Sequence, residues 1–310
     1  MLINKLNQVL RISVILLFIT QLTLSNVQAQ IVWENPRLPI NSFLSRQAQK
    51  GNINIADFIL PMSRKEIAFN LSALKDSIHK LSVIEKEELN FYLQEYTEFN
   101  PNRIDSTLFF KNDPYGRWRA FSAETSDFLI RIDPATSLET TQGGGKSIMK
   151  MSGGLQLWGH MGKNISFQAF FTDFTEYGTR IDTIRQFSNE TGIVRFENVK
   201  KDSKLLTYSN LRGSVGYEFK NGSVSLGNDQ LLWGYGENGR LVMSDKAPAY
   251  PFIRLDYQPL KWVKFQYAHT WLQSAILDSA RTYPKGNTIY GSDREIYVSK
   301  FMATHSLNFF

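Results

Sequence analysis

Three glycines with the spacing of a dinucleotide-binding loop lie in the segment LLWGYGENGRLVMSDKAPAYP, residues 231–251. A G-x-G-x-x-G sequence binds a pyrophosphate when it joins a buried strand to a helix and an acidic residue follows about 20 positions later. Here residues 223–227 alternate between polar and apolar, and residues 240–244 are typical of a strand and lead to Pro248 and Pro251. These surroundings predict a loop in a β protein and no dinucleotide site.

The other patterns that suggest chemistry are incomplete. The stretch TQGGGKS at 141–147 ends like a phosphate-binding loop but has Thr140 at the first glycine position, so we expect a glycine-rich hairpin connection there. Four histidines are scattered without metal-ligand spacing, and the adjacent His305 and Ser306 would point to opposite faces of a strand. The net charge of +6 is too small to indicate nucleic-acid binding. We predict a protein that is not an enzyme and uses no cofactor or metal.

The first 29 residues are typical of a cleaved export signal. Lys5 and Arg11 precede an apolar stretch that extends to about residue 24, and cleavage is expected after Ala29. The alternative, a membrane anchor, is weakened because the stretch is short for a bilayer span. The chain has no cysteine, which excludes a lipoprotein anchor, disulfide bonds and thiolate metal sites.

The composition favours an outer-membrane β-barrel. Aromatic residues make up 13% of the chain, including 22 Phe, while the mean hydropathy is only −0.27. After the signal segment, no apolar run reaches the ~20 residues of a membrane helix. An exported, aromatic-rich chain that is polar on average is typical of strands that alternate between lipid and lumen. The alternative is a soluble periplasmic or secreted β protein.

Residues 30–110 are predicted to form a periplasmic helical region. Capping boxes begin at Ser63 and at Ser82, and each precedes an apolar stripe with helical spacing. A shorter helix is expected at about 43–49. The region is too small for an independent core, so we expect it to pack on the barrel and block its periplasmic mouth.

Residues 111–310 are predicted to form the barrel. Apolar and polar residues alternate in hairpins with short turns at 162–164, 220–222 and 259–261, while long polar segments separate the hairpins. Short turns on one side and long loops on the other are typical of outer-membrane barrels. About eight strands are expected, near 127–133, 150–161, 164–174, 206–219, 223–229, 251–258, 262–273 and 297–310.

The glycine-rich segment resembles a pattern of the Wzi capsule-assembly family, which runs close to W-G-P-G, a short gap and S-L-I-L-S-N-N-A-R-P-x-P. Here Trp233-Gly234-Tyr235-Gly236 begins the match and Gly239 to Ala247 continues it, with Tyr235 in place of the proline and Asp245-Lys246 in place of the paired asparagines. Residues 60–67, LPMSRKEI, resemble the family's P-L-S-R-x-E-I, and residues 301–305 resemble one of its mid-barrel strands.

This resemblance implies a monomeric outer-membrane lectin, with a barrel of about 18 strands, that holds capsular or exopolysaccharide at the cell surface. Aromatic faces suit sugar rings, and charged side chains can bind hydroxyls or uronates. The expected carbohydrate-binding residues are Trp233, Tyr235, Arg240, Asp245 and Lys246, with Gly234, Gly236, Gly239 and Ser244 shaping the loop. The expected partners are surface polysaccharide and outer-membrane lipid.

Three alternatives stay open at this point. The glycine-rich segment could be a constriction loop without a ligand, the protein could be a passive porin or transport channel, or it could be a structural or motility-associated protein of the surface. Because about eight strands fall short of about 18, we also expect these 310 residues to be a copy truncated at its C-terminal side.

Overall fold

A computed structural model describes residues 31–97, 105–179, 181, 205–236, 240, 242–244, 249–260, 262–272, 274, 276–282 and 296–309. The expected export signal lies outside these residues. The helices are α2 (Pro39–Gln49), α3 (Arg64–Asp76), the short 3-10 helix η1 (Ile78–Lys80) and α4 (Val83–Glu95). The strands are β1 (Ile59–Leu60), β2 (Ser106–Asn112), β3 (Trp118–Glu124), β4 (Phe128–Pro134), β5 (Ser137–Gly143), β6 (Lys146–Met161), β7 (Ile165–Gly178), β8 (Leu205–Phe219), β9 (Gly222–Asp229), β10 (Leu232–Trp233), β11 (Tyr250–Leu260), β12 (Val263–Leu272) and β13 (Lys300–Phe309).

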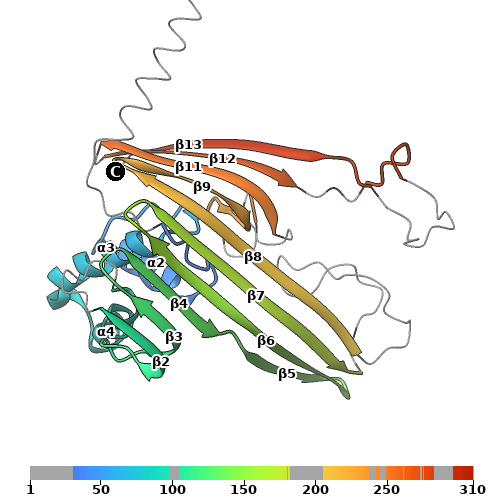
Figure 1. Ribbon diagram of the computed structural model, residues 1–310, viewed down its shortest axis with the longest axis horizontal. Helices are drawn as coiled ribbons and strands as arrows, with labels where there is room; N and C mark the ends of the chain where they lie inside the picture. Colours follow the sequence, from blue (N-terminus) through green and yellow to red (C-terminus); the bar gives the residue numbers. More distant parts are fainter. Residues whose placement is uncertain are drawn as a thin grey trace, which may run out of the picture.

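The fold is mainly β, as predicted, and its main sheet is antiparallel. The strand order is β13-β12-β11-β9-β8-β7-β6-β4-β3-β2. The strand β5 pairs with the first half of β6, residues 146–152. The described strands form an open sheet with β13 and β2 at its edges. Figure 1 shows this sheet curling around the helices, with β11–β13 on one side of them and β2–β4 on the other.

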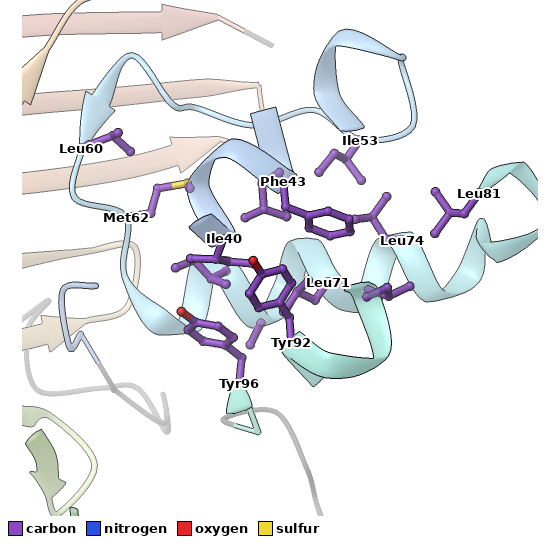
Figure 2. Packing of buried hydrophobic residues seen from close by; sticks show 14 of the residues in the cluster. Ile40, Phe43, Ile53, Leu60, Met62, Leu71, Leu74, Leu81, Tyr92 and Tyr96 are labelled. Atoms are coloured by element: carbon purple, nitrogen blue, oxygen red, sulfur yellow. The ribbon is translucent and has the colours of Figure 1, made fainter. Parts of the chain in front are cut away.

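The helical region forms where the capping residues predicted it. The Ser63 hydroxyl accepts a hydrogen bond from the Glu66 backbone N–H and begins α3, and Ser82 and Glu85 form a complete capping box at the start of α4. The helix α2 ends at Gln49, followed by Gly51 with φ +72°. One hydrophobic cluster holds the helices together, with Phe43, Leu71 and Leu74 at its centre (Figure 2).

The sheet has its polarity reversed relative to that of a water-soluble protein. On the face toward the helices, here called the inner face, many of the buried strand side chains are polar, including Arg131, Ser225, Arg254, Asp256 and Gln266, and they lie among buried apolar side chains such as Trp158 and Phe252. On the opposite, outer face the large apolar side chains are exposed: Leu155, Phe171, Leu211, Val215, Val224, Leu226, Ile253, Phe301, Leu307 and Phe309. The two sets alternate along each strand, as the period of two requires.

The helices lie at the end of the sheet where the short turns are. Lys65 on α3 forms an ion pair of 2.7 Å with Glu218 at the end of β8, next to the turn at 220–221. Its neighbour Glu66 accepts hydrogen bonds of 3.1 and 3.3 Å from Lys264, near the start of β12. The sequence predicted Glu66 as the second half of a capping box, but its carboxylate instead joins the helix to the sheet.

The structure adds strands that the sequence pattern did not predict. The strands β2 and β3 precede residue 126, so the sheet begins at Ser106 inside the region expected to be helical. The strands β1, β5 and β10 also lie outside the eight that were expected. The GGG stretch is a tight turn between β5 and β6, as predicted, with Gly144 and Gly145 at positive φ. None of the helices in the described residues is both long and apolar enough to span a bilayer.

Candidate functional site

The glycine-rich segment begins with a strand that pairs with the helical region. The strand β10 forms a two-stranded antiparallel sheet with β1, in which Trp233 lies opposite Ile59 and Leu232 lies opposite Leu60. The Gly234 N–H donates a 2.8 Å hydrogen bond to the Phe58 carbonyl, and Trp233 exchanges backbone hydrogen bonds with Met243. The segment is therefore folded back against the residues that lead into α3.

The two adjacent residues of β10 pack against different parts of the molecule. Leu232 belongs to the helical cluster together with Leu60. Trp233, only 3% exposed, packs on the opposite side with Ile59, Met243 and the inner-face residue Ala268 of β12. The β1–β10 sheet is thus the layer between the helices and the wall of the main sheet. In this structure the Trp233 ring has no free face to offer a sugar, so its predicted contact with carbohydrate stays a prediction.

Of the two aromatic residues that the sequence predicted to bind carbohydrate, Tyr235 is the one exposed to solvent. Its side chain is 63% exposed, its hydroxyl donates to Asp57 Oδ1 at 2.9 Å, and its ring meets Phe58 edge-on at 5.4 Å. Partial loss of hydration around the hydroxyl and its hydrogen bond to Asp57 raise the pKa of Tyr235 to about 12. The contacts with Asp57 and Phe58 orient the ring and leave part of it exposed. The raised pKa means that the hydroxyl is protonated at neutral pH.

The structure describes only some of the other residues that the sequence predicted for this site. Arg240 donates to the Gly234 carbonyl oxygen, and Ser244 is half-buried one residue beyond Met243. Gly234 and Gly236 have φ values of +98° and +134°, the left-handed region that favours glycine. Arg240 is thus held at the backbone of the residue before Tyr235, while Gly239, Asp245 and Lys246 lie outside the described residues.

A second candidate site is a cavity of about 500 Å³ between the helical region and the inner face, partly open to solvent. Its lining comes from the segment 32–38, from α3 and α4, and from strands β3, β4, β6, β7, β8 and β9. Its residues are far apart in the chain, so no local sequence pattern predicts it. The one available signal was the pairing of charged with aromatic residues in residues 115–119, YGRWR.

Glu95, at the end of α4, organises the charges of this cavity. Its carboxylate lies 2.9 Å from Arg119, 3.1 Å from Arg64 and 3.2 Å from Arg117. Burial works to raise the pKa of Glu95, but Arg64 and Arg119 outweigh it and lower the pKa to about 2. Arg64 also holds Glu34 at 2.8 Å and stacks on the Trp158 ring at 4.0 Å.

The far wall of the cavity carries polar atoms without partners. Arg212 on β8 is 10% exposed, stacks over Phe170 at 4.6 Å and donates from Nη1 to Asp229 at 3.2 Å. Its Nε and the Oε1 of Gln168 on the neighbouring strand are buried, and neither has a hydrogen-bond partner among the described residues. Both residues line the cavity, but each of these two atoms has less than 1 Å² of accessible surface, so a ligand in the cavity reaches them only if the side chains shift.

The described residues hold no group of three or more His, Asp or Glu side chains that could bind a metal ion. No protein-family model, curated protein or solved structure matches the chain.

Proposed function

We propose that this protein is an outer-membrane β-barrel protein that binds polysaccharide at the cell surface, with its helical region closing the periplasmic mouth. The observation that carries the membrane part is the reversed polarity of the sheet. Charged residues such as Arg131 and Arg254 are buried on the inner face, while Leu211 and Leu226 are exposed on the outer face. In water this arrangement would leave a large apolar surface uncovered, whereas lipid would cover it.

The aromatic residues of the outer face support the same proposal. At the turn end, Trp262 stacks with Phe309 at 6.2 Å, and nine residues further along β12, Trp271 lies opposite Phe301. Nine residues of a strand are about 30 Å long, which at a tilt of ~40° is a height of about 23 Å. An outer-membrane barrel has an apolar band about 25 Å tall between two aromatic girdles.

The position of the helices supports a closed protein over a passive channel. Ion pairs from Lys65 and Glu66 fix α3 to two strands of the wall, and the β1–β10 layer fills the space between helices and sheet. A porin needs an open lumen. In lipid, closure of the wall requires pairing of the edge strands β2 and β13, because unpaired backbone groups are costly there.

The polysaccharide part rests on the resemblance of residues 231–251 and 60–67 to the Wzi family. Tyr235 supports it, because its exposed ring is fixed by Asp57 and Phe58 and can stack on the apolar face of a sugar. The test is retention of surface polysaccharide by cells that carry Tyr235→Ala with Arg240→Ala. Cells with the wild-type protein, or with the control Tyr235→Phe, should keep their polysaccharide.

The double variant should release polysaccharide while the amount of protein in the outer-membrane fraction stays unchanged. Full retention by cells that lack the protein altogether would refute the polysaccharide role. Recovery of the wild-type protein only in the soluble periplasmic fraction would refute the membrane assignment.

A further inference from the structure

The positive charge of the glycine-rich segment has no counter-ion in the described part of the chain. Arg240 is half-buried and donates through Nη1 to the Gly234 carbonyl, and its guanidinium has no carboxylate partner among the described residues. Most of the other described arginines lie within 3.5 Å of a carboxylate oxygen: Arg46, Arg64, Arg117, Arg119, Arg131, Arg212, Arg254 and Arg281. An anionic ligand group can therefore pair with Arg240 without breaking an internal ion pair.

Tyr235 keeps this cation apart from the carboxylate of Asp57. The Tyr235 hydroxyl donates to Asp57 Oδ1 at 2.9 Å, whereas Arg240 is bound to the peptide group between Gly234 and Tyr235. The tyrosine side chain is rigid, so its hydroxyl end and its backbone end cannot meet. A ligand on the Tyr235 ring therefore meets a cation near one end of the ring and a carboxylate near the other.

These two ends suit the two sides of a uronic acid. A hexuronate carries its carboxylate on one side of the ring and a pair of adjacent hydroxyls on the other. The carboxylate can accept charge-assisted hydrogen bonds from Arg240, and a hydroxyl can donate to Asp57 Oδ2, which has no donor among the described residues. The Tyr235 ring, 63% exposed, can stack on the apolar face of the sugar. A neutral sugar would leave Arg240 without a counter-ion.

The site lies toward the end of the sheet that carries the long connecting segments. Phe58, which meets Tyr235 edge-on, packs against the cluster around Trp233 together with Leu272. Leu272 is the last residue of β12, so it lies at the opposite end of that strand from the short turn that joins β11 to β12. In the proposed membrane orientation this end faces the cell surface, where a polysaccharide can reach Tyr235.

We propose that the polysaccharide bound at Tyr235 is acidic, with a uronic acid carboxylate against Arg240 and the sugar ring against Tyr235. The inference deepens the proposed function and rests on it, since it names the class of sugar and not the role of the protein. It also assigns Asp57 to the site, as the acceptor for a sugar hydroxyl.

The first test uses the full chain in detergent micelles, immobilised, and polysaccharide extracted from the surface of the host cells. Half of the polysaccharide is treated with carbodiimide and borohydride, which reduces uronic acid carboxylates to neutral alcohols. The protein should retain the untreated polysaccharide and bind the reduced form at least roughly tenfold more weakly. Salt at about 0.5 M should weaken binding of the untreated form alone, because it screens exposed charges.

Defined probes separate the contribution of the carboxylate from that of the ring. In saturation-transfer NMR, methyl β-D-glucuronide should bind with a dissociation constant on the order of millimolar, and methyl β-D-glucoside roughly tenfold more weakly. Inorganic phosphate has a charge but no ring, so it should displace the glucuronide only in large excess. Tighter binding of phosphate than of the glucuronide would indicate a phosphate site and overturn the proposal.

Arg240→Gln removes the charge and keeps a donor for the Gly234 carbonyl. This variant should bind the glucuronide roughly tenfold more weakly and the glucoside within about twofold of the wild type. Arg281→Gln is the matched control, because Arg281 is an exposed arginine on the connection between β12 and β13 that pairs with Asp278. An exposed pair contributes little to stability, so this variant should fold and bind both glycosides like the wild type.

Undiminished binding of the reduced polysaccharide would overturn the acidic class and leave the polysaccharide role standing. Equal binding of the glucuronide by Arg240→Gln and the wild type would do the same. Absence of binding of the untreated polysaccharide would also overturn the inference. The proposed function fails separately, when cells that lack the protein keep all of their polysaccharide.

Discussion

The guanidinium of Arg254 lies 3.9 Å from the centroid of the Trp33 ring, which joins the inner face of β11 to the first described segment of the chain. The same guanidinium donates to the Pro61 carbonyl at 2.9 Å and to both oxygens of Asp256. The Trp33 indole N–H donates to Ser225 Oγ at 3.1 Å. These contacts connect the lead-in to α3 with two adjacent strands, so the helical region and the wall should unfold together.

Arg254→Met should lower the free energy of unfolding by about 3–5 kcal/mol, because it leaves Asp256 buried without its main cation. The double variant Arg254→Met, Asp256→Leu should recover much of this loss, since it removes both charges. Urea titration of protein folded into lipid vesicles measures both values. Equal losses in the single and double variants would contradict the role assigned to the ion pair.

Trp233 and Tyr235 should respond to substitution in opposite ways. Trp233→Ala should cost about 3–5 kcal/mol of folding stability, because the ring fills the layer between helices and sheet. Tyr235→Ala should change stability by about 0.5 kcal/mol, because most of its side chain is exposed. The urea midpoints of the two variants test this. A stable Trp233→Ala protein with lost polysaccharide binding would restore Trp233 as a binding residue.

Glu95 makes stability depend on pH in a defined window. Because its folded pKa of about 2 is below the usual 4.5, its contribution is present above pH 4.5 and is lost as the pH falls from about 4.5 to about 2. Thermal unfolding of wild type and Glu95→Gln in detergent at pH 6, 4 and 3 measures the effect. The wild type should lose its advantage over the variant across this window, and a constant difference would argue against the assignment.

The helical region should block ion flow. In a planar bilayer the whole protein should give little conductance, because α3 is fixed to β8 and β12 through Lys65 and Glu66. Glu66→Lys should weaken this attachment and increase the frequency of brief channel openings. Glu66→Lys combined with Lys264→Glu should restore the low conductance of the wild type. A large, stable pore in the wild-type protein would favour the passive channel.

Much of the fold follows from local pattern, and the exceptions have physical causes. The cap at Ser63 and the strands from β6 to β9 depend on residues close in the chain, and both were predicted. The strand β5 has a single large apolar residue, Leu138, and extends the line of β4 along β6, so its pattern has no alternation to detect. The strands β2 and β3 were also missed, because neither alternates regularly: β2 is exposed over its last four residues, and the buried residues of β3 are unevenly spaced.

The site was harder to predict because it depends on distant partners. Trp233 is buried because β10 pairs with β1, more than 170 residues earlier in the chain, and no local pattern reveals that pairing. The cavity likewise combines Arg64, Trp118, Gln168 and Arg212 from four separate elements. Sequence spacing predicted the flexible glycines Gly234 and Gly236, but not that the residue before them packs against the wall.

The central claim is that lipid covers the outer face of the sheet, and the absence of cysteine makes it directly measurable. Single cysteines placed at Ser223, Val224, Ser225 and Leu226 of β9, labelled with an environment-sensitive fluorophore, report the surroundings of alternate faces in protein folded into vesicles. Labels at Val224 and Leu226 should be quenched by brominated lipid, and labels at Ser223 and Ser225 should not. Labels at Val224 and Leu226 that are quenched by a water-soluble quencher, and not by brominated lipid, would contradict the account.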